Sequence, residues 1–338
     1  MVINETLAKG LKDRFFNEFP RDIDAYAEDM GKIRLDLRKK NQWLRAVREG
    51  LARSNRLSLG SYEGGSNTKP YFVLNVMAVM KDRPYNIWNE KCLCAGQIVS
   101  AFHSPVRVMP GFFNIGEHAV MRLYMRSPVQ LDENMNIVPY AIIEQFKYLP
   151  LWAAFWVWLQ QWLKQSGGHS PFSPIMPAPN GLFLSDLRSE HDRGTEIRTF
   201  INDFQMNAER KFVRDLMLNI SDPLRHSPMF ASPAAENRGD VANGVLSRMI
   251  VDLLAPHLDR IAKVIFPTEG GDVNVDHTRS VFVRAVKALV GDEKSSQQLF
   301  ELFCRSSVDA QRKFLVQLNH SMRVAGEGRS ITLPPCND

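Results

Sequence analysis

The sequence predicts an α+β protein that is mainly α-helical, with a small, mostly antiparallel β-sheet in its middle and a long basic helix near its N-terminus. Apolar residues recur in a seven-residue pattern over residues 23–51, as in a long helix that packs along one stripe. Residues 70–80, PYFVLNVMAVM, are apolar on both faces and rich in strand-forming residues. Residues 149–165, LPLWAAFWVWLQQWLKQ, form an apolar run of helical length that a glycine pair follows.

The chain of 338 residues is long enough for about two domains of ordinary size. Residues 221–243 are rich in Pro, Ser, Asn and Ala, and this composition predicts the main domain boundary. We expect four parts: a basic helical arm over 1–60, an α+β central domain over 61–220, a helical domain over 244–324 and a mobile tail over 325–338.

Positive charge is concentrated in the expected N-terminal arm. Residues 32–56 hold nine basic and two acidic residues, a net charge of +7, whereas the whole chain carries +5. A local positive stripe attracts a polyanion through release of its counterions. The alternative interpretation is an ordinary solvated helix face. The residues predicted to contact phosphates are Arg34, Arg38, Lys39, Arg45, Arg48 and Arg53.

The apolar stripe of residues 23–51 needs a partner helix. One candidate is a second copy of the chain, which predicts a homodimer through a coiled coil. The other is residues 5–19, where Leu7, Leu11 and Phe15 recur every four residues and would form an internal hairpin. Both alternatives stay open at this level.

The other elements follow from local patterns in chain order. Residues 85–102 are ambiguous between helix and strand, and the glycine-rich residues 60–65 are expected to end the basic helix. We expect an extended segment at 104–110, helices at 117–126 and 140–148, a hairpin of strands at 182–187 and 196–201, a helix at 204–218, a helix at 245–266 kinked near Pro256, and helices at 281–289, 296–304 and 309–324.

Four of the six tryptophans lie in the predicted helix at 149–165, which we expect to be a central core helix. A membrane-surface helix or a partner groove is the alternative, but its polar face lacks the basic residues of surface helices. No run of about 18 apolar residues predicts a membrane span, and the N-terminus does not resemble a signal peptide. The four cysteines suit a reducing compartment, so we expect a cytoplasmic protein.

Standard motifs for cofactors and metals are missing from the sequence. No phosphate-binding or dinucleotide-binding glycine motif is present. Cys92 and Cys94, with His103 and His118, lack the spacing of a zinc knuckle, and buried cysteines are the simpler interpretation. The calcium-loop pattern that begins at Asp272 lacks its glycine and its terminal glutamate. We therefore expect neither a metal nor a cofactor.

One group of residues has the chemistry of a phosphodiester site. His118, Arg122 and Arg126 are spaced four residues apart, so they share one face of the helix predicted at 117–126. Arginine binds phosphate through two donors, and histidine transfers a proton near neutral pH. The alternative is an ordinary amphipathic helix with Glu117 balancing an arginine.

The pattern Ile115-Gly116-Glu117-His118-Ala119-x-x-Arg122-x-x-x-Arg126 resembles the strand and His-Ala-x-x-Arg helix of RelE/BrnT-like ribonuclease toxins. In that family a compact sheet follows the helix, and basic residues with histidine cleave RNA without a metal. The resemblance covers about residues 104–205. It implies strands at 181–183 and 197–201 and roles for His118, Arg122 and Arg198, with a long insertion before the strands that the family lacks.

Three functions follow, in order of preference. The first is binding of DNA or RNA through the basic helix, with Arg126 as a further contact. The second is a metal-free ribonuclease with His118 and Arg122 as catalytic residues. The third is a structural or adaptor protein of a larger assembly, which needs only the seven-residue repeat and the Trp-rich core.

Overall fold

The chain divides into two compact units. A computed structural model describes residues 3–18, 28, 41–43, 45–46, 58–65, 70–79, 92–101, 106–128, 139–165, 172–187, 195–224, 239–267, 275–290, 298, 300–302 and 305. The first unit comprises residues 1–153 and 171–218, and the second comprises residues 154–170 and 219–338. All the described strands belong to the first unit, so the sheet and its helices can be considered by themselves.

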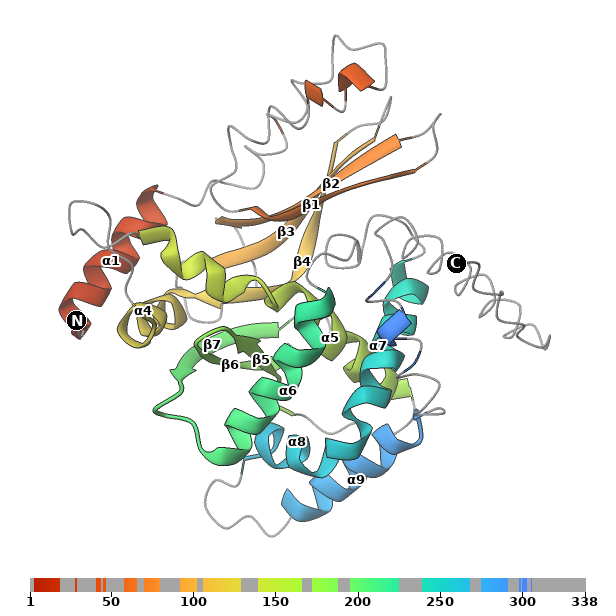
Figure 1. Ribbon diagram of the computed structural model, residues 1–338. Helices are drawn as coiled ribbons and strands as arrows, with labels where there is room; N and C mark the ends of the chain where they lie inside the picture. The colour runs from red at the N-terminus through yellow and green to blue at the C-terminus, as the bar shows by residue number, and fades with distance from the viewer. Residues whose placement is uncertain are drawn as a thin grey trace. The chain divides into compact units, whose positions relative to one another are not determined.

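The first unit is built on a seven-stranded mixed sheet (Figure 1). Its order is β1-β2-β3-β4-β7-β6-β5, and every neighbouring pair is antiparallel except β4 and β7. That parallel pair is short and joins Phe113–Ile115 to Thr195–Ile197. The strands are β1 (Ser58–Gly65), β2 (Pro70–Val79), β3 (Cys92–Ala101), β4 (Arg107–Gly116), β5 (Ile175–Ala178), β6 (Gly181–Leu187) and β7 (Thr195–Asn202).

The α+β class and the mostly antiparallel pairing are confirmed, but the prediction of a small sheet is wrong, because the sheet has seven strands. The buried strand at 70–80 and the hairpin at 182–187 and 196–201 form β2 and the pair β6 and β7. Two further strands come from unexpected places. The ambiguous residues 85–102 contain β3, and the glycine-rich residues predicted to end a helix lie in β1 at the sheet edge. Low strand propensity did not prevent pairing, because β2 supplies the hydrogen-bonding partner of β1.

The first N-terminal helix is short and electrically balanced. Helix α1 (Glu5–Glu18) has 14 residues, with three basic and three acidic side chains. Its apolar residues Leu11 and Phe15 are buried, whereas Leu7 is 39% exposed. It packs against α4 (Glu117–Arg126) and against the 3-10 helix η1 (Pro139–Phe146). The predicted long basic helix and the dimer seam over 23–51 lie outside the described residues, except for Glu28, 41–43 and 45–46.

The Trp-rich helix has the predicted boundaries. Helix α5 (Leu149–Gln165) begins in the first unit and continues into the second. Trp152 and Trp156 are buried, and Trp158 and Trp162 are half-buried. Within the described part of the chain, no helix has the length and apolar character needed to cross a membrane.

Every described secondary-structure element of the second unit is a helix. Helix α6 (Ala208–Leu224) begins in the first unit and runs past the expected boundary at residue 221. After it come α7 (Gly239–Leu254), the 3-10 turn η3 (Ala255–His257), α8 (Leu258–Ile265) and α9 (Val275–Lys287). The predicted kink near Pro256 is confirmed, because η3 interrupts the helix at that proline. Arg279 of α9 donates to the carbonyl of Phe266 at 2.6 Å, while the rings of Phe266 and Phe282 meet edge to face at 5.4 Å.

Gly181 is required by close packing inside the sheet. A Cβ atom at this position would lie 2.2 Å from the carbonyl oxygen of Ile201 and 2.5 Å from the Phe200 ring. We expect Gly181→Ala to lower the free energy of unfolding by about 1–3 kcal/mol, as overpacking does. Gly10→Ala is the matched control, because nothing lies within 4 Å of a Cβ there. Because alanine favours a helix more than glycine does, Gly10→Ala in α1 should raise the free energy of unfolding by up to about 1 kcal/mol. Urea denaturation measures the free energy of unfolding of both variants, and equal values for the two would contradict the close-packing role of Gly181.

Candidate nucleic-acid interface

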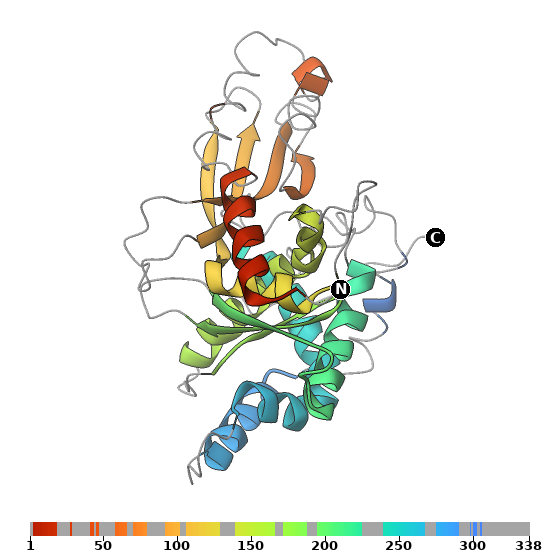
Figure 2. The same ribbon diagram turned by 90° about the vertical axis from the view of Figure 1, so that its left-hand side faces the viewer.

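Helix α4 is held between a sheet strand and the N-terminal helix. It begins directly where β4 ends, and it packs against β7 and α1 (Figure 2). Its buried side is apolar and comprises Ala119, Val120, Leu123 and Tyr124. The predicted helix boundaries are confirmed, and the pattern of burial leaves His118 exposed and Arg122 and Arg126 half-buried. These three side chains are called the basic row below.

Polar and aromatic contacts fix α4 against α1. The Lys12 ammonium lies 2.6 Å from the Glu117 carboxylate and 2.8 Å from that of Asp13. Burial alone would lower the pKa of Lys12, but the hydrogen bonds and charges of these two carboxylates outweigh it and raise the pKa. Phe15 and Tyr124 pack edge to face with ring centroids 6.5 Å apart, and burial raises the pKa of the Tyr124 hydroxyl. Glu117 is therefore paired with Lys12 of the N-terminal helix.

His118 and Arg122 are brought together as the spacing predicted. The Arg122 Nε atom donates a hydrogen bond to His118 Nε2 at 3.3 Å. This bond requires a neutral imidazole with its proton on Nδ1, because a protonated nitrogen cannot accept. The pair therefore offers one guanidinium with donors still available and one neutral imidazole, both on an accessible helix face.

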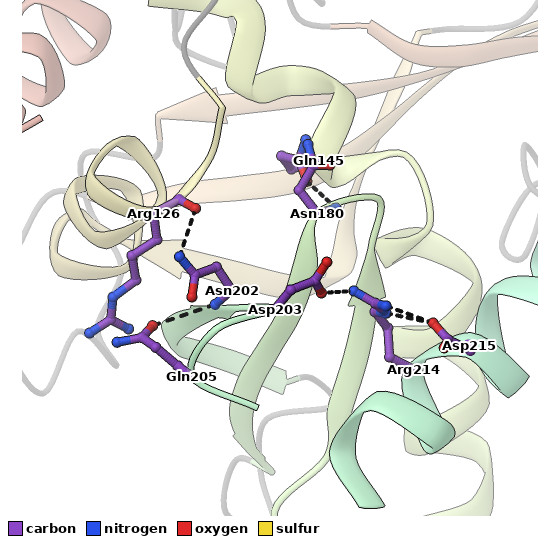
Figure 3. Close-up of polar contacts among 8 residues, drawn as sticks. All are labelled: Arg126, Gln145, Asn180, Asn202, Asp203, Gln205, Arg214 and Asp215. Atoms are coloured by element: carbon purple, nitrogen blue, oxygen red, sulfur yellow. Dashed lines mark hydrogen bonds and ion pairs between the residues drawn. The ribbon is translucent and has the colours of Figure 1, made fainter. Parts of the chain in front are cut away.

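Arg126 has a structural contact that the sequence did not indicate. Its guanidinium donates to the backbone carbonyl of Phe200 in β7, and Asn202 donates its side-chain amide to the Arg126 carbonyl at 3.2 Å (Figure 3). Burial, and then the neighbouring Arg122 charge, lower the pKa of Arg126. Arg126 thus joins the C-terminal end of α4 to the end of β7. Because a backbone carbonyl is neutral, this contact does not cancel the positive charge of Arg126.

The structure describes one of the six predicted phosphate contacts in the basic arm. Arg45 is helical and exposed, two residues from Trp43, which is only 1% exposed. Trp43 is not a position of the predicted seven-residue stripe, and Leu44, which is one, lies outside the described residues. The other predicted contacts lie outside the described residues: Arg34, Arg38, Lys39, Arg48 and Arg53.

Other residues singled out in the sequence have different surroundings. Arg198 is exposed on β7 and pairs with Asp186 of the neighbouring strand β6. Cys92 and Cys94 are buried in β3, whereas His103 lies outside the described residues. Over the described residues, no three histidines, cysteines or carboxylates gather as metal ligands would.

One prominent surface residue was missed from the sequence. Phe204 lies in the turn between β7 and α6 and is 97% exposed. We had expected a helix to begin there, but the helix begins at Ala208, and Asn207 caps it by accepting from the Arg210 amide at 2.9 Å. The aromatic residue in the polar run Asn202–Asn207 is the signal that would have identified it.

Comparison with known proteins adds no relative. No family model matches the chain, and searches of curated proteins and of solved structures found no match. The resemblance to RelE/BrnT-like toxins therefore stays a prediction from the sequence motif at residues 115–126.

Proposed function

We propose that the protein binds nucleic acid, with the basic arm as its main contact. The observation that carries the proposal is the net charge of +7 over residues 32–56, in a chain whose total is +5. Double-stranded DNA and RNA are dense polyanions, and a positive segment of this kind gains affinity from the counterions that it displaces. Such contacts bind without reading sequence, because they reach phosphates rather than base edges.

The surroundings of Arg45 support this role for the arm. Arg45 is exposed, whereas Trp43, two residues earlier, is buried. One side of this stretch is therefore packed and the other is open to solvent. The basic row of α4 would add a second positive surface, since Arg122 and Arg126 contact a histidine and a carbonyl rather than carboxylates.

The double variant Arg38→Ala/Arg45→Ala tests the arm. We expect weaker binding of all oligonucleotide sequences alike, and a salt dependence whose slope is smaller by about one for each phosphate contact removed. Fluorescence anisotropy at several salt concentrations measures both quantities. Arg248→Ala/Arg284→Ala is the matched control, since it removes two exposed arginines from α7 and α9. Unchanged affinity of the arm variant at low salt would remove this segment from the interface.

A ribonuclease centred on His118 is the second candidate. The contact of 3.3 Å between Arg122 and His118 favours it, because a neutral imidazole beside a guanidinium joins a proton acceptor to a phosphate ligand. Arg126 would contribute charge rather than a direct bidentate contact while its guanidinium holds the Phe200 carbonyl.

A further inference from the structure

Phe204 is exposed to a degree that a packing role does not explain. Its side chain is 97% exposed, whereas the other large exposed apolar residues of the described chain, Leu7 and Leu302, are 39% and 41% exposed. Phe200, four residues earlier, is fully buried. A phenylalanine is among the residues most often buried in proteins, so a ring that lies wholly in solvent is available to a binding partner.

The turn that carries Phe204 is braced on both sides (Figure 3). The Gln205 amide donates to the Asn202 carbonyl at 3.0 Å, and the Gln205 side chain accepts from the Asn202 amide at 3.5 Å. Asp203 forms an ion pair with Arg214 of α6, and Arg214 also contacts Asp215 at 2.7 Å. The backbone on either side of Phe204 is therefore fixed, and binding through the ring would require little ordering of the turn.

Positive charge lies next to this turn. Asn202 bonds the last residue of α4, so the turn adjoins the C-terminal end of the basic row. Within the described residues, Arg122 and Arg126 have a histidine and a carbonyl as partners, and neither is paired with a carboxylate. Half-buried Arg210 and exposed Lys211 follow in the first turn of α6, together with one acidic residue, Glu209. An aromatic ring beside several cations is complementary to a chain of bases joined by phosphates.

We infer that Phe204 is a stacking platform for an unpaired base of a single-stranded nucleic acid whose phosphates lie along the basic row. The inference rests on the proposed function and adds the class of nucleic acid to it. Every base has a flat π-face that stacks on an aromatic ring, whereas the bases of a duplex already stack on each other. The platform therefore favours single strands over duplexes, without preference for a base.

Substitution of Phe204 separates stacking from charge. Fluorescence anisotropy would follow labelled single-stranded DNA, single-stranded RNA and a blunt duplex of the same sequence. Loss of one stacked base predicts about 5- to 150-fold weaker binding of both single strands by Phe204→Ala. Phe204→Trp should retain the affinity, and the salt slope should not change because no cation is removed. Leu7→Ala, which removes another exposed apolar side chain, is the matched control.

The outcomes distinguish this inference from the proposed function. If the wild type binds with a steep salt dependence and Phe204→Ala binds single strands as tightly as the wild type, the stacking role is overturned and nucleic-acid binding stays intact. The ring would then belong to a protein interface. Equal losses on single strands and duplex would also overturn it. Absence of any wild-type binding at low salt would overturn both. Because Phe204 makes no buried contact, thermal melting of Phe204→Ala should match the wild type, which shows that the variant is folded.

Discussion

Trp156→Ala should lower the free energy of unfolding by about 3–5 kcal/mol, as truncation of a large buried aromatic side chain does. Trp156 lies in α5 and is 1% exposed, and its indole meets the Phe155 ring with centroids 5.0 Å apart. Truncation to alanine removes the aromatic contact area and leaves a cavity that close-packed neighbours fill only in part. A loss of this size approaches the whole stability of many domains.

Trp158→Ala is the matched control for this prediction. Trp158 is on the same helix but half-buried, so its truncation removes less packed surface and should lower stability by a smaller amount. Urea denaturation followed by far-UV circular dichroism measures both variants. A Trp156→Ala variant as stable as the wild type would contradict the core assignment of α5 and favour the membrane-surface or partner-groove alternative.

His118→Ala should slow RNA cleavage by about 10²–10⁴-fold if the second candidate function holds, which is the usual contribution of one general base. In that reaction an imidazole nitrogen of His118 accepts the 2′-hydroxyl proton, the 2′-oxygen attacks the adjacent phosphorus, and the 5′-oxygen leaves and takes a proton from water. The products carry a 2′,3′-cyclic phosphate and a 5′-hydroxyl. Since Arg122 occupies Nε2 and the proton is on Nδ1, the 2′-hydroxyl must displace the bond to Arg122.

Cleavage is measured on labelled single-stranded RNA, with DNA of the same sequence as the unreactive substrate. Activity should survive a chelator, because no step requires a metal. His277→Ala is the matched control, since it removes an exposed histidine from α9. RNA left intact by the wild type would rule out this enzyme, and the basic row would then be a binding surface on which Arg122→Ala weakens affinity more than His118→Ala.

The sequence predicted elements best where a strong local pattern agreed with the tertiary environment. Helices α4 and α5 have their predicted boundaries, because apolar periodicity marks α4 and the glycine pair Gly167–Gly168 ends the apolar run of α5. The hairpin of β6 and β7 was also predicted, since two alternating apolar runs flank a polar turn. Strand β1 was not, because its Ser and Gly residues have low strand propensity and only pairing with β2 makes them a strand.

The candidate site was predicted in part for the same reason. Helical spacing is local, so the contact of His118 with Arg122 followed from the sequence. The bond from Arg126 to the Phe200 carbonyl joins residues 74 positions apart, and no local pattern encodes it. The exposure of Phe204 likewise depends on the brace between Asp203 and Arg214 and on the start of α6 at Ala208.

The salt dependence of nucleic-acid binding tests the central claim most directly. The association constant of the wild-type protein for a short DNA duplex would be measured by fluorescence anisotropy over a series of salt concentrations. If the six predicted residues of the basic arm contact phosphates, a plot of log K against log salt should fall with a slope of roughly −5. A slope near zero, or no binding at low salt, would contradict nucleic-acid binding through the arm and leave the ribonuclease and the structural or adaptor function as the remaining candidates.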